Sequence, residues 1–145
     1  MSDEGRVASG EVPLRRPVRG YRDLLVWQRA MDLLVAVYGL TRQLPRTEAF
    51  GLTGQLQRAV VSIPGNIAEG QGRLHRGDFV HHLSIARGSL LEVETYLVAI
   101  VRLGFLPSRE VDPVIAACEE VSRLLAGLLK SLGELRLHRR GRDNR

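Results

Sequence analysis

The apolar residues of this chain fall into four stripes with helical spacing, separated by short segments that contain glycine and proline. The first stripe begins near Asp23 and ends before Pro45, and the second begins around Thr47–Glu48. The third is a heptad seam that ends at Gly104, and the fourth follows Pro107. Long amphipathic helices with short loops predict an all-α fold, an antiparallel up-down-up-down four-helix bundle. The predicted core positions are Trp27, Ala30, Met31, Leu34, Val37, Tyr38, Leu52, Leu56, Ala59, Val60, Ile63, Ile67, Phe79, Leu83, Ala86, Leu90, Val93, Leu97, Ile100, Val111, Val114, Ile115, Cys118, Val121, Leu125, Leu128 and Leu132.

Pro64 lies inside the second stripe, whose apolar residues keep their helical spacing on both sides of it. Because proline lacks a backbone N–H and clashes with the preceding turn, the sequence predicts a kink in the second helix. We also expect Asn66 and Glu69 to form a polar network near this kink, together with Arg58, that fixes the helix register. The structural motif that we assign consists of Ser62, Pro64, Asn66, Glu69, Gly70, Gly88 and Ser89.

Three glycines of this region have predicted backbone roles. Gly70 and Gly72 are expected to end the second helix through left-handed backbone. Gly88, together with Ser89, is expected to allow a close approach between helices.

Further apolar residues lie outside the four stripes. A second apolar face on a small bundle usually covers a partner, so we expect self-association. These residues are Ile85, Leu91, Tyr96 and Val98 on the third helix, and Leu124 and Leu129 on the fourth.

Charge divides the chain into three parts. Residues 1–20 lack periodicity and are predicted to be a flexible basic arm, residues 21–134 the bundle, and residues 135–145 an Arg-rich tail. Of the net charge of +5, residues 1–22 carry +2, residues 136–145 carry +4, and residues 23–135 carry −1. Twenty of the 21 basic residues are arginine, which suits phosphate contacts but also follows from codon usage in a GC-rich genome.

The sequence favours a protein that is not an enzyme and that has no metal or cofactor. A di-metal bundle site needs paired Glu-x-x-His motifs, and the nearest match is a single Asp78-x-x-His81. No histidine stands at a supporting distance from Ser62 or Ser89, and no phosphate-binding loop follows a strand. Cys118 is predicted to be a buried structural thiol. No signal peptide or membrane-spanning stretch is visible, which predicts a cytoplasmic protein without membrane contact.

Eight arginines are candidates for binding nucleic acid. Four would form a basic rim near the turn between the second and third helices, where the alternative is solvated helix ends and intersubunit ion pairs. The other four lie in the tail, where the alternative is a disordered solvated terminus. Phe79 is the only aromatic residue near the rim, and its heptad position places it in the core. The candidates are Arg58, Arg73, Arg76, Arg87, Arg136, Arg139, Arg140 and Arg142.

Five segments, in this order, resemble the four-helix-bundle proteins of the 23S rRNA intervening-sequence family: Tyr21–Ala30, Gly51–Ala59, Ser62–Gly70, Ile85–Leu90 and Leu103–Leu106. The resemblance implies a bundle that assembles into a homopentamer. It also implies an accessory protein without catalytic activity, similar to the accessory proteins of diversity-generating retroelements. Those proteins partner a reverse transcriptase and bind nucleic acid.

Three positions depart from the family pattern. His75 stands where a capping serine or threonine is usual, which weakens the start of the third helix. His82 replaces an aromatic residue, which leads to the hypothesis that its protonation makes assembly sensitive to pH. Gln57 replaces a commonly basic residue beside Arg58.

From the sequence we therefore expect a non-enzymatic, homopentameric accessory protein associated with RNA or DNA, and with a reverse transcriptase or another protein as partner. The alternative is a protein-interaction scaffold that binds no nucleic acid. A metal-dependent bundle enzyme is the third interpretation.

Overall fold

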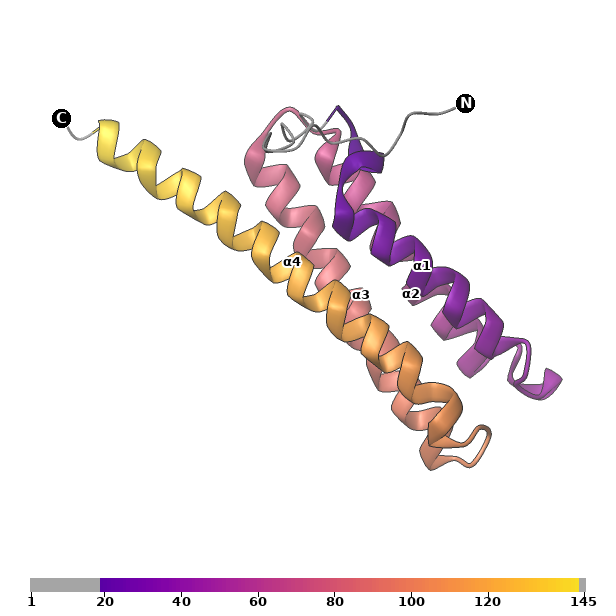
Figure 1. Cartoon of the computed structure of the whole chain (residues 1–145). Coiled ribbons are helices and arrows are strands. Elements are labelled where there is room, and N and C mark those ends of the chain that lie inside the picture. The colour runs from indigo at the N-terminus through magenta and orange to yellow at the C-terminus, as the bar shows by residue number, and fades with distance from the viewer. Residues whose placement is uncertain (1–18, 144–145) are drawn as a thin grey trace, which may run out of the picture.

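The computed structural model describes the backbone of residues 19–143 and the side chains of residues 19–133. It contains four α-helices, and α4 packs back against α1 so that the four close into a bundle (Figure 1). Each helix is antiparallel to the next along the chain, and no strand occurs among the described residues. This confirms the predicted all-α, up-down-up-down arrangement. The elements are η1 (Tyr21–Asp23), α1 (Leu25–Thr41), η2 (Arg46–Glu48), α2 (Leu52–Gln71), α3 (Arg76–Arg102) and α4 (Ser108–Asp143), where η marks a short 3₁₀ helix.

The first two helices begin later than the sequence predicts. Asp23 belongs to η1, where its carboxylate accepts the backbone N–H of Arg19 at 3.0 Å. Glu48 belongs to η2, and its carboxylate accepts the N–H of Leu52 at 3.1 Å. An acid that satisfies a free N–H group in the first turn stabilises a helix start. Glu48 therefore stands before α2, where it acts as an external cap.

The helix ends show where a glycine is needed for its backbone. Gly104 has a φ of 77°, and the N–H of Phe105 bonds to the Ile100 carbonyl at 3.0 Å, which is a Schellman ending for α3. The left-handed ending predicted at Gly70 and Gly72 is wrong, because among the described residues only Gly104 has a positive φ. At the start of α3, His75 makes no side-chain capping bond, which agrees with the weak start predicted there.

The buried core positions follow the predicted apolar stripes, except that the buried face of α1 is rotated by one residue. In α2, α3 and α4 most of the predicted positions are buried, and the remainder pack against the core at partial burial. In α1 the buried face is centred one residue away from the predicted one, so that Trp27, Met31 and Leu34 lie at its edge. The buried residues of this helix are Val26, Ala30, Leu33, Val37, Leu40 and Thr41.

Pro64 is buried within α2, and the helix continues past it to Gln71. The kink expected there stays a prediction. The last helix, α4, runs to Asp143 and extends past the ends of the other helices (Figure 1). The predicted Arg-rich tail therefore coincides with the end of α4, where only the backbone is described. None of the described helices has the length and apolar character needed to cross a membrane.

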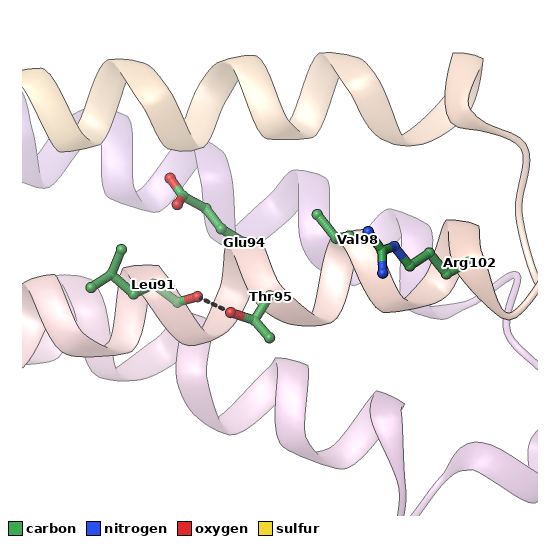
Figure 2. Close-up of a pocket in the computed structure, with 5 residues that line it drawn as sticks. All are labelled: Leu91, Glu94, Thr95, Val98 and Arg102. Carbon is green, nitrogen blue, oxygen red and sulfur yellow. Dashed lines mark hydrogen bonds between the residues drawn. The ribbon is translucent and has the colours of Figure 1, made fainter.

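Two acidic side chains lie close to a buried thiol where α3 packs on α4. Cys118 is buried, and burial, followed by the charges of Glu94 and Glu119, raises its pKa to about 12. Such a thiol stays protonated at neutral pH, which suits its predicted structural place in the core. Glu94 points from α3 toward α4 (Figure 2), and desolvation, followed by repulsion from Glu119, raises the pKa of its carboxyl above the ordinary 4.5.

We predict that Glu94→Gln stabilises the fold at neutral pH. Because the pKa of Glu94 is higher in the folded than in the unfolded chain, its ionisation disfavours folding, and this cost disappears as the pH falls below 4.5. Screening by solvent limits the gain at pH 7 to about 0.5 kcal/mol. Urea unfolding at several pH values measures it, with Glu92→Gln, at an exposed position of the same helix, as the control. A gain that persists at pH 3.5 would contradict the assigned cause.

Candidate functional site

A continuous chain of polar side chains joins α2 to α3 next to Pro64. The Ser89 hydroxyl donates to the Ser62 hydroxyl oxygen at 2.8 Å. The Asn66 amide nitrogen donates to the Ser62 carbonyl at 2.8 Å and to the Ser62 hydroxyl oxygen at 3.0 Å. The Asn66 Oδ1 atom lies 3.0 Å from Nδ1 of His82. We call these four half-buried residues, Ser62, Asn66, His82 and Ser89, the polar seam.

The bonding pattern fixes the orientation of two side chains in the polar seam. A backbone carbonyl only accepts hydrogen bonds, so the Asn66 atom that faces the Ser62 carbonyl is its NH₂ group. The other amide atom is then the acceptor Oδ1, and His82 must donate to it from Nδ1. Nε2 of His82 lies 3.9 Å from the carboxylate of Glu69, which is paired with Arg73 at 2.6 Å. The Glu69–Arg73 ion pair therefore lies at the surface beside the polar seam, without a hydrogen bond to His82.

The geometry of the polar seam positions helices and does not activate a nucleophile. The hydroxyls of Ser62 and Ser89 are bonded to each other and to Asn66, and no bond joins either of them to the His82 imidazole. Each buried polar side-chain atom within residues 19–133 has a hydrogen-bond partner. Over the same residues, no three His, Cys, Asp or Glu side chains gather as metal ligands would. What the arrangement does is connect two helices at defined points.

Gly70 brings α2 and α3 into direct contact beside the polar seam. A Cβ atom placed on Gly70 would lie 2.7 Å from Cβ of His82 and 3.0 Å from Cδ2 of Phe79. Real Cβ atoms do not approach this closely, and the His82 Cβ cannot move without its helix. Gly70 is thus required by the packing of α3, and not by the left-handed backbone that the sequence suggested.

Two residues assigned from the sequence lie outside this contact. Gly88 is exposed and has no atom within 4 Å of where its Cβ would lie, so within one chain it allows no close approach. Arg58 is exposed on α2, and none of its hydrogen bonds joins the polar seam. The contacts expected for these two residues are made instead by Ser62, His82 and Ser89. Of these three, His82 is not predicted from the sequence as a member of the network. The sequence feature that could have identified His82 is its position one heptad before Ser89, on the helix that follows the one with Ser62 and Asn66.

The four arginines expected to form a basic rim do not gather in one cluster. Arg73 is paired with Glu69, and Arg76 opens α3 at partial exposure. Arg58 lies on α2, 13 residues before the helix ends at Gln71, which corresponds to about 20 Å along its axis, and Arg73 follows in the loop after α2. Arg87 is exposed near the middle of α3. The tail candidates Arg136, Arg139, Arg140 and Arg142 lie on α4 beyond the residues whose side chains are described.

Comparison with known families assigns the chain. The family model of the 23S rRNA-intervening sequence proteins matches residues 22–127, which include all of α1, α2 and α3 and most of α4. The chain belongs to this family. The resemblance read from the five sequence segments is thereby confirmed.

The intervening-sequence fold is also seen in a solved relative. A crystal structure of a protein of unknown function from the S23 ribosomal protein family of Bacteroides thetaiotaomicron superposes with a TM-score of 0.69 at 24% identity. The match covers 73% of this chain and 99% of the other, and at this identity it supports the fold alone. None of the curated proteins matches the chain.

We predict that Gly70→Ala destabilises this family member by about 1–3 kcal/mol, because the added methyl group forces α2 away from α3. Gly65→Ala is the matched control in the same helix. Gly65 is exposed with open space around it, so alanine there is expected to raise stability by up to about 1 kcal/mol through helix propensity. Thermal and urea unfolding measure both. Equal effects of the two substitutions would show that the α2–α3 contact is looser than described.

We also predict that Asn66→Asp costs about 1–3 kcal/mol, although it preserves the shape of the side chain. It replaces the donor that faces the Ser62 carbonyl by an acceptor, which leaves two oxygen atoms opposed. Gln55→Glu makes the same chemical change at an exposed position near the start of α2. There, the helix dipole favours the new charge. If urea unfolding gave the same stability for both variants, the assigned orientation of the Asn66 amide would be wrong.

Proposed function

We propose that the protein is a non-enzymatic, homo-oligomeric accessory protein that binds RNA or DNA through its arginine-rich terminal segments. The observation that carries this proposal is the separation of charge along the chain. Residues 23–135 carry a net charge of −1, whereas residues 1–22 and 136–145 together carry +6. Basic segments attached to a nearly neutral body favour contact with a polyanion at the ends of the chain.

The outer face of α3 supports self-association. Leu91 is 55% exposed and Val98 45% exposed, and because they are seven residues apart they lie on the same side of the helix. With Glu94, Thr95 and Arg102 they line a shallow groove (Figure 2). By contrast, Leu124 and Leu129 on α4 pack partly buried against the core of their own chain. Of the two predicted apolar faces, the one on α3 therefore remains exposed, whereas the one on α4 packs within its own chain.

A pentamer, the assembly that the family resemblance implies, suits weak basic contacts. Each copy contributes its own terminal segments, so that several low-affinity phosphate contacts act together on one nucleic acid. The role of the folded body is then to present these segments at a fixed spacing. A reverse transcriptase or another nucleic-acid enzyme is the partner class that fits an accessory protein of this kind.

The second candidate function is a protein-interaction scaffold without nucleic-acid binding. The observation that favours it is the state of the arginines in the body. Arg73 is already paired with Glu69, and Arg58, Arg76 and Arg87 are spread over two helices. The two proposals differ in whether the arginines of the terminal segments bind phosphate.

The test is fluorescence anisotropy with labelled single-stranded and structured RNA over a salt series, on protein whose mass is fixed by light scattering. We predict that an oligomer binds with an affinity that falls steeply with salt. Replacing Arg136, Arg139, Arg140 and Arg142 by glutamine should lower the logarithmic salt slope by about 0.7 for each phosphate of a single strand that is no longer neutralised. An oligomer that binds no nucleic acid near 100 mM salt supports the scaffold, and a monomer contradicts both proposals.

A further inference from the structure

Phe50 is an aromatic side chain left almost entirely in solvent. It lies between η2 and α2 in the loop after α1, and it is 97% exposed. The other two phenylalanines of the chain, Phe79 and Phe105, are partly buried against the core. The ring of Phe50 therefore contributes little to the packing of the chain itself and is free to contact another molecule.

Three arginines accompany Phe50 in this part of the chain. Arg42 follows the last residue of α1 and Arg46 opens η2, and both are exposed. A Cβ atom placed on Gly54 would lie 3.6 Å from a guanidinium nitrogen of Arg58 and 2.9 Å from the carbonyl oxygen of Ala49. Arg58 therefore reaches back from α2 to the residue that precedes Phe50. Within residues 19–133 none of the three arginines forms an ion pair.

The acidic residue of the loop is engaged in the fold. The carboxylate of Glu48 accepts the N–H of Leu52 and lies against Gly51, so it is committed to the start of α2. Three cations and one committed anion leave the loop positive, next to a free aromatic face. This combination of phosphate-binding groups with a stacking platform is what single-stranded nucleic acid requires.

We propose that the Phe50 loop, residues 42–58, is a contact site for single-stranded nucleic acid, in which Phe50 stacks on a base and Arg42, Arg46 and Arg58 bind phosphates. The inference rests on the proposed function and adds a site in the folded body to the terminal segments.

A protein partner fits the Phe50 loop less well. A side chain that anchors a protein interface usually sits in apolar surroundings that exclude water. The neighbours of Phe50 along the chain are Thr47, Glu48, Ala49 and Gly51, which are polar or small. Stacking on a base needs no such surroundings, because each base offers its own flat face.

The Phe50 loop is also separate from the arginine-rich segment at the C-terminal end of α4. The loop joins α1 to α2 at one end of the bundle, whereas the C-terminal end of α4 projects from the opposite end (Figure 1). The 20 residues of α2 alone correspond to about 30 Å. The two regions therefore contact different nucleotides, and their contributions to binding can be measured separately.

The experiment compares full-length variants by fluorescence anisotropy with labelled oligo(U) and oligo(dT) of about 12 nucleotides, the length range of a short single-stranded site. Phe50→Ala is expected to weaken binding about 5- to 150-fold, the range expected when one base no longer stacks on an aromatic ring. Phe50→Trp should retain the affinity, and Phe50→Leu should weaken binding nearly as much as alanine, because it keeps the apolar character without the ring. Weaker binding of both oligonucleotides indicates stacking alone, and weaker binding of oligo(U) only adds recognition of the 2′-hydroxyl.

Leu74→Ala is the matched control, because Leu74 is 98% exposed, lies in the loop between α2 and α3, and also stands between two arginines, Arg73 and Arg76. It should leave binding unchanged. If the wild type binds and Phe50→Ala behaves like Leu74→Ala, the Phe50 site is overturned while the terminal segments remain. If the wild type binds neither oligonucleotide, this inference and the proposed function both fail. If Phe50→Ala changes the mass measured by light scattering, Phe50 lies between copies of the chain and the inference is overturned.

Discussion

The close approach of α2 to α3 at Gly70 is the constraint on which the rest of the structure depends. No side chain fits between Gly70 and the Cβ atom of His82, so the two helices touch at this point without an intervening layer. Only at this separation do short side chains such as serine and asparagine reach across from one helix to the other. A larger residue at position 70 therefore affects more than local packing, because it also removes the geometry of the polar seam.

The polar seam fixes the register of α2 relative to α3 at this contact. On α2 its members, Ser62 and Asn66, are four residues apart, whereas on α3 Ser89 and His82 are seven apart. The Asn66 amide bridges this difference, since its nitrogen reaches back to Ser62 while its oxygen faces His82. Sliding one helix along the other by a turn would break both connections and leave half-buried polar atoms without partners. Pro64 lies between the two α2 members and has no N–H to donate, so the α2 ladder lacks one bond in the stretch that the polar seam connects to α3.

The fold could be predicted from the sequence because apolar periodicity directly records which face is buried. The heptad seam of α3 located its core positions, and the Gly104 ending followed from the local preference of glycine. The predicted buried face of α1 differs from the observed face by a rotation of one residue. Val26 and Trp27 both continue an apolar stripe, and only packing against the neighbouring helices decides which of them is buried. The polar seam was harder to predict from the sequence. Asn66 and Glu69 stand out as polar residues near a proline, but their partners lie on another helix at a distance that depends on Gly70, which no local pattern specifies. The exposure of Phe50 could not be predicted from the sequence, because periodicity does not show whether an apolar residue in a loop is exposed.

The sides of α3 carry three different kinds of surface, and this division accounts for how the proposed assembly is driven. Its core face is closed by the other helices, and its polar seam is satisfied within the chain, so neither has much to gain from association. The outer face with Leu91 and Val98 has no such partner, and burying apolar area there would favour a contact between copies. Because residues 23–135 are nearly neutral, copies approach one another with little net repulsion between their bodies. The positive charge outside this range opposes assembly until a polyanion neutralises it. Oligomerisation and nucleic-acid binding are therefore expected to support each other, since each added copy brings phosphate-binding groups and each bound phosphate lowers the repulsion between copies.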